Sequence, residues 1–119
     1  MDPVLLQADS IYHQLGDNSK EDDGVVAFVY LMRARINHQL DPDQSKGLSK
    51  PFYEKLVELI APKADLDNTD KSRLKEGYHY LISYHFTQKN DKATAQEYAR
   101  KMLAIDPDNQ IAKQVMGMK

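Results

Sequence analysis

The four histidines of this chain are the residues whose side chains could bind a metal or transfer a proton. Their spacing speaks against a metal site, because no His-x-x-x-His pair and no HExxH motif occurs, and no cysteine is present to complete a tetrahedral set. Two of them are six positions apart, which places them on roughly opposite faces of one helix. We therefore interpret all four as structural or surface residues; they are His13, His38, His79 and His85.

Tyrosines are a second group of candidates, and Tyr78, Tyr80 and Tyr84 stand near one another in the sequence. Such a cluster indicates either an aromatic platform for a ligand or side chains that fill the space between helices. We favour the packing interpretation, because stacked helices need large residues at their contacts.

Acidic residues gather in segments that have the composition of loops, at Asp41, Asp43, Asp65, Asp67 and Asp70. Their spacing resembles no calcium loop, which would need a glycine at the turn and a closing glutamate, so we predict turn formers and helix caps. The chain has neither a G-x-S-x-G motif nor a glycine-rich phosphate loop. We therefore expect no catalytic residue, no metal and no cofactor, and we predict that the protein is not an enzyme.

Composition narrows the possible partners. The 119 residues predict one domain, and 16 basic against 18 acidic residues leave no basic excess for nucleic acid. No apolar run approaches the roughly 20 residues that span a bilayer, and the N-terminal segment has no signal-peptide pattern. The sequence does not determine the cellular compartment. We expect the cytoplasm by default, or export if the chain is cut from a longer precursor.

Strand patterns are nearly absent, and apolar residues recur at helical spacing, so the fold class is predicted to be all-α. The first helix should start with Asp2 as its cap and Pro3 at its first position, and should end at Gly16. Thr69 is a plausible cap for the helix that contains Tyr78. The other predicted helices are 24–39, 49–60, a run from about Ala95 to Ile105, and a short one that Asn109 caps.

The stretch from Tyr78 to Asn109 carries a family resemblance. Its residues Tyr78, Leu81, Ala95, Tyr98 and Pro107 resemble the signature of the tetratricopeptide repeat, a helix-turn-helix unit of about 34 residues. Ile82 departs from the family pattern, which has glycine or alanine there. As a whole, the chain resembles the C-terminal part of tetratricopeptide-repeat proteins of Bacteroidetes-type bacteria.

The resemblance implies a right-handed stack of antiparallel helix pairs, an α-solenoid of about five helices with a short C-terminal capping helix. The implied units are a half repeat, two full repeats and the capping helix. Ala34 would let a neighbouring backbone come close, and the 45 positions between Tyr53 and Tyr98 exceed the family period, so stacking should be irregular. The units cover residues 2–16, 24–62, 69–107 and 109–117.

The family also implies a function, because the first helix of each repeat lines a concave groove that binds a partner peptide or helix. Arg35 is the strongest candidate, since a guanidinium can bind a carboxylate bidentately; pairing with an acid of this chain is an equally good interpretation. Carried onto this sequence, the groove residues are Leu31, Arg35, His38, Gln39, His79, Ser83, Phe86 and Thr87.

The main expectation is thus a non-catalytic protein-interaction module whose partner is a protein or peptide. One alternative is a structural role, either as the terminal cap of a longer repeat protein or as a homo-oligomer formed through the unpaired N-terminal helix. The other is a small-molecule-binding protein or an enzyme of unknown type.

Overall fold

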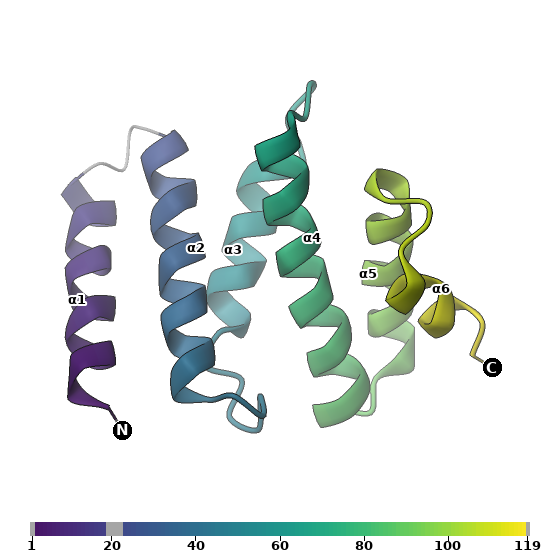
Figure 1. The fold of residues 1–119 in the computed structure, drawn as a ribbon, viewed down its shortest axis with the longest axis horizontal. Coiled ribbons are helices and arrows are strands. Elements are labelled where there is room, and N and C mark those ends of the chain that lie inside the picture. Colours follow the sequence, from purple (N-terminus) through teal and green to yellow (C-terminus); the bar gives the residue numbers. More distant parts are fainter. Residues whose placement is uncertain (1, 19–22, 119) are drawn as a thin grey trace.

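The described residues form six α-helices, and helices that are consecutive along the chain pack on each other (Figure 1). The computed structural model describes residues 2–18 and 23–118, and these contain no β-strand, which confirms the all-α prediction. A π-helical segment, η1 (Tyr84–Gln88), extends α4. The α-helices are α1 (Pro3–Asn18), α2 (Asp23–Leu40), α3 (Lys50–Ile60), α4 (Asn68–Ser83), α5 (Lys92–Ile105) and α6 (Gln110–Met116).

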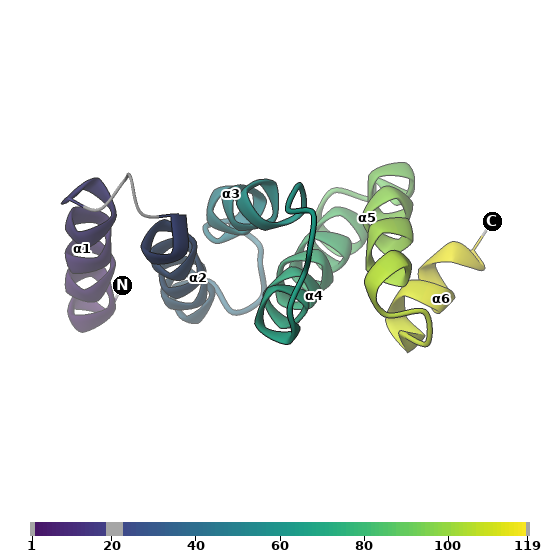
Figure 2. The ribbon, with the colours of Figure 1, turned by 90° about the horizontal axis from the view of Figure 1, so that it is seen from above.

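The helices form a thin slab whose principal extents are 44 × 36 × 17 Å. Seen from above, α3 and α5 lie on one side of the slab, and α2, α4 and α6 lie on the other (Figure 2). The chain therefore crosses from one side to the other at each loop between α2 and α6. Because α2, α4 and α6 share a side, residues far apart in sequence meet there.

Short polar side chains cap four of the described helices, and two of the three caps predicted from the sequence are present. The Asp2 carboxylate accepts from the backbone N–H of Val4 at 2.8 Å, and Asn109 accepts from Ala112 at 2.9 Å. The predicted cap at Thr69 is wrong. Asp67 caps α4 instead, in a reciprocal pair with Asp70, because a carboxylate and the third residue of the helix can satisfy each other's backbone donors.

Gly16 does not end the first helix, contrary to the prediction, since α1 continues to Asn18. A Cβ atom at Gly16 would lie 3.1 Å from Cγ1 of Val29 on α2. The glycine is therefore a point of close contact between α1 and α2. The predicted close approach at Ala34 is also present: Ala34 is fully buried, and its carbonyl accepts the Ser49 hydroxyl at 2.6 Å.

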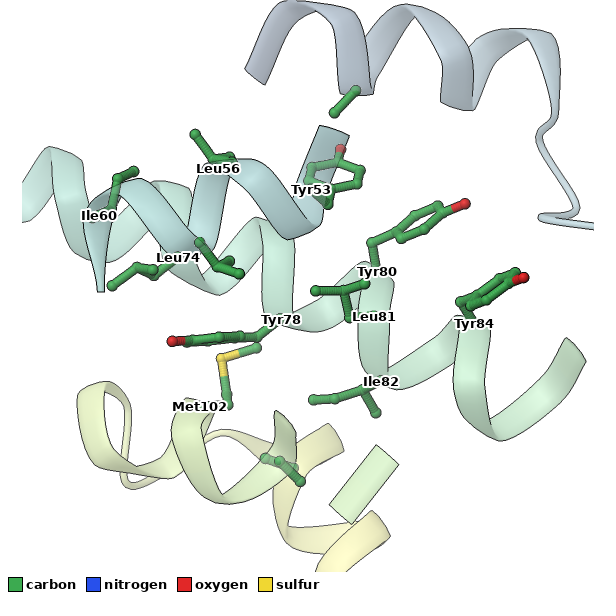
Figure 3. Packing of buried hydrophobic residues seen from close by; sticks show 14 of the residues in the cluster. Tyr53, Leu56, Ile60, Leu74, Tyr78, Tyr80, Leu81, Ile82, Tyr84 and Met102 are labelled. Atoms are coloured by element: carbon green, nitrogen blue, oxygen red, sulfur yellow. The ribbon is translucent and has the colours of Figure 1, made fainter. Parts of the chain in front are cut away.

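The core is centred on α4, which packs on α3 and on α5. Figure 3 shows Leu74 facing Leu56 and Ile60 of α3, and Tyr78 facing Met102 of α5. A Cβ at Gly77 would lie 2.7 Å from Cγ1 of Val57, so α3 and α4 are in close contact. The three clustered tyrosines are each at most 6% exposed, which confirms the packing interpretation for Tyr78, Tyr80 and Tyr84.

Leu81→Ala tests this core. Leu81 is 0% exposed, so truncation should lower the free energy of unfolding by about 2–5 kcal/mol through lost transfer energy and the cavity left behind. Chemical denaturation followed by circular dichroism measures the change. His79→Ala is the control, because His79 is exposed on the same helix. Equal stability of Leu81→Ala and the wild type would contradict the packing.

Ala95→Leu tests the contact between α4 and α5 by enlarging a buried side chain instead of truncating one. Ala95 is 0% exposed, so the added atoms have no free space, and overpacking should cost about 1–3 kcal/mol. The midpoint of thermal unfolding should fall, and the same substitution at exposed Ala93 should leave it nearly unchanged. An unchanged midpoint for Ala95→Leu would show that α5 is not tightly packed there.

Candidate functional site

The side of the slab formed by α2, α4 and α6 carries two hollows, which we together call the groove. The first, of about 540 Å³, lies between α2 and α4. The second, of about 230 Å³, lies between α4 and α6. His79 and Ser83 of α4 line both, so the hollows are neighbours along one face of α4.

Helical spacing places the predicted groove residues on common faces. Arg35, His38 and Gln39 are three and four positions apart on α2, and all three line the first hollow. Phe86 and Thr87 follow α4 in η1 and line the second hollow. Leu31 lies elsewhere: it is 5% exposed in the core and lines neither hollow.

Arg35 is held by a carboxylate of this same chain. Its Nη2 lies 2.7 Å from Oε1 of Glu76, and its Nε lies 3.0 Å from Oε2. The Tyr53 hydroxyl donates to Oε2 of the same glutamate at 2.8 Å. The intramolecular pairing considered for Arg35 is therefore confirmed, and one carboxylate joins α2, α3 and α4 at the floor of the groove.

Burial and hydrogen bonding have opposite effects on the pKa of Glu76. Burial alone would raise the pKa of Glu76, but hydrogen bonds from Arg35 and Tyr53 outweigh it, so the pKa lies below its usual value. Burial raises the pKa of Tyr53, and the hydrogen bond to Glu76 raises it further. The carboxylate is thus ionised and the phenol neutral at pH 7, which leaves the pair of Arg35 and Glu76 without net charge.

Aromatic rings form the wall beside this pair. The rings of His38 and Tyr80 are nearly perpendicular at 5.6 Å between centroids, and Tyr53 lies 4.8 Å from Tyr80. Nδ1 of His38 and the Tyr80 hydroxyl are buried without a hydrogen-bond partner among the described residues. Burial, and then the charge of Asp41, raises the pKa of Tyr80 to about 12.

The loop between α2 and α3 closes one end of the first hollow. The Asp41 carboxylate accepts from the backbone N–H of Lys46 and of Leu48, each at 3.2 Å, which confirms its predicted role as a turn former. Two contacts attach the loop to the far side of the hollow: the Ser83 hydroxyl donates to Oε1 of Gln44 at 2.9 Å, and Gln88 donates to the Asp43 carbonyl at 2.8 Å.

Several residues of the site were not predicted from the sequence. Glu76 lies three positions before His79, so helical spacing alone could have placed it on the groove face. Tyr53 and Tyr80 come from the packed face of their helices, and α6 was predicted only as a cap. The second hollow also includes Ile111, Gln114, Val115 and Met118 from α6 and the segment after it.

The histidines do not gather into one centre. His13 pairs with Asp17 on α1 at 3.2 Å, and His85 stacks on Tyr98 with 5.8 Å between ring centroids. Within residues 2–18 and 23–118, no group of three or more histidine, cysteine or acidic side chains is arranged to hold a metal. No helix in the same ranges is long and apolar enough to cross a bilayer.

Comparison with protein-family models, with curated proteins and with solved structures gave no significant match to this chain.

Glu76→Gln tests the electrostatics of the groove floor. A carboxylate whose pKa is lowered on folding stabilises the fold above its unfolded pKa, about 4.5, and this contribution is lost as the pH falls through the lowered value. The wild type should therefore lose more stability than Glu76→Gln between about pH 7 and about pH 3. Denaturation curves at both pH values measure this difference. Equal losses would show that the carboxylate is not stabilised by Arg35 and Tyr53.

Proposed function

We propose that this chain is a non-catalytic protein-interaction module of the tetratricopeptide type, which binds a peptide or helix of a partner protein in the groove. The observation that carries the proposal is the sharing of His79 and Ser83 by both hollows. A continuous surface across α2, α4 and α6 suits an elongated ligand better than a compact one.

The order of the helices supports the tetratricopeptide part of the proposal. Helices α2 and α4 lie on one side of the slab, and α3 and α5 lie on the other (Figure 2). Consecutive helices pack on each other, as the two helices of a repeat and those of neighbouring repeats do. We propose that α2 with α3, and α4 with α5, form two repeats, with α6 covering the second.

The two hollows differ in chemistry, which suggests what the partner must offer. The second hollow contains Ile82, Phe86 and Met118, so it suits one apolar anchor residue. The first hollow adds charged and hydrogen-bonding groups to an aromatic lining: the pair with Glu76 uses Nε and Nη2 of Arg35, so the N–H groups of Nη1 can serve an external acceptor. We therefore expect a partner with an apolar residue at one end and hydrogen-bonding groups at the other.

Selection from a random peptide library on the immobilised protein tests the proposal without knowledge of the natural partner. Enriched peptides should combine an apolar residue with polar residues, and His79→Glu should weaken their binding at least about tenfold, because His79 belongs to both hollows. Fluorescence anisotropy with labelled peptides measures the dissociation constants.

Arg100→Glu is the matched control, because Arg100 is exposed on α5 and lines neither hollow. It makes the same change to glutamate at another surface and should leave peptide binding unchanged. Circular dichroism checks that both variants are folded. A failure to enrich any peptide, or equal effects of His79→Glu and Arg100→Glu, would contradict binding in the groove.

A further inference from the structure

Exposed apolar side chains are concentrated at α1, the first helix of the slab. Among the described residues, seven large hydrophobic side chains are exposed; four of them lie on α1, and Phe28 lies on the helix beside it. Single exposed hydrophobic residues are common, but a cluster on one helix marks an interaction surface. The four on α1 are Val4 at 70%, Leu6 at 46%, Ile11 at 58% and Leu15 at 40%.

Three of these residues share one face of the helix. Val4, Ile11 and Leu15 are seven and four positions apart, so they line up along α1, and half-buried Ala8 fills the gap between them. We call these four residues the α1 stripe. Leu6 is about 160° away from Val4 around the helix and does not belong to it.

The steps between the residues of the α1 stripe are the same whether they are counted from the N-terminal or from the C-terminal end of the helix. From Val4 to Ala8, Ile11 and Leu15 the steps are four, three and four residues. Two copies of α1 that run antiparallel would therefore place Val4 opposite Leu15, and Ala8 opposite Ile11. Each larger Ile11 would then face the smaller Ala8 of the other copy, which is how side chains interdigitate between packed helices.

Charge also favours contact of the stripe with itself. The charged residues of α1 point away from it: Asp9, His13 and Asp17 lie at least about 140° around the helix from Val4. Asp9 is already held by Arg33 of α2, with 2.9 Å between Oδ1 and Nε. Asp2 of one copy and Asp17 of the other would lie at the same level of the pair but on its outer faces, so no like charges would meet on the stripe, and antiparallel helices oppose their dipoles favourably.

We propose that the α1 stripe is the contact between two copies of this chain, joined by a two-fold axis that passes near Asp9 and Ser10. The contact is isologous, because each copy contributes the same residues. One helix of 16 residues on each side is about 24 Å long, which gives an interface at the small end of the known range. The dimer is therefore weak, with a dissociation constant on the order of 100 µM.

Sedimentation equilibrium over about 10 µM to about 1 mM tests the association. The average mass should rise from 13.6 kDa towards twice that value. Ile11→Glu should keep the chain monomeric, since it places a charge on the stripe at a site that is already exposed. Leu6→Glu is the matched control, being a similar change on the same helix but off the stripe, and should dimerise as the wild type does.

A wild type that stays monomeric at about 1 mM would overturn the proposal, and so would equal dimerisation of both variants. A monomeric chain in which Ile11→Glu weakens the binding of groove peptides would show that the stripe belongs to the groove instead. Circular dichroism of each variant confirms that α1 is folded, so a loss of dimer is not a loss of structure.

Cross-linking tests the direction of the helices, because the chain has no cysteine of its own. An oxidised mixture of Val4→Cys and Leu15→Cys chains should give mainly mixed disulfide dimers. Either variant alone should cross-link poorly, since like positions would be about 16 Å apart along the pair, beyond the reach of a disulfide. Efficient cross-linking of Val4→Cys with itself would indicate a parallel pair and overturn the arrangement.

Discussion

The packing of α4 between two other helices is the constraint on which the rest of the structure depends. An isolated helix cannot bury its apolar residues, and α4 buries Leu74 and Tyr78 only because α3 and α5 lie on either side of it. With these faces covered, its third face is open and carries His79 and Ser83. The groove is thus the surface left over when the core has been formed, and its position follows from the packing.

The groove floor and the scaffold share residues. Glu76 joins Arg35 of α2 to Tyr53 of α3, and Gln44 in the loop between them bonds to Ser83 of α4. These contacts fix the distance between α2 and α4 before any ligand binds. Because ordering a binding surface costs entropy, the peptide binding that we propose would gain affinity from a groove that is already held in place.

The two ends of the slab differ. At the C-terminal end, α6 is short, and its Ala112 and Val115 are buried against the neighbouring helix. At the N-terminal end, α1 packs on α2 and leaves an apolar stripe exposed. Three of the four exposed hydrophobic residues on α1 lie on this stripe, and the contact between two copies that we propose would cover them.

The sequence alone determined the features that depend on interactions between residues a few positions apart. Helical spacing, proline and the capping side chains act within a few positions, so the helices and the Asn109 cap were predictable; the error at Thr69 arose because Asp67, two positions away, makes a better cap. The proposed groove residues came from the family resemblance, and the structure places seven of the eight along the two hollows. Tertiary structure decided the rest. The pairing of Arg35 with Glu76 spans 41 positions, Leu31 is buried in a core that several helices share, and Gly16 lies in close contact with Val29 of the next helix. These outcomes depend on which helix faces come together, and that is set by the packing of the whole chain rather than by any local pattern.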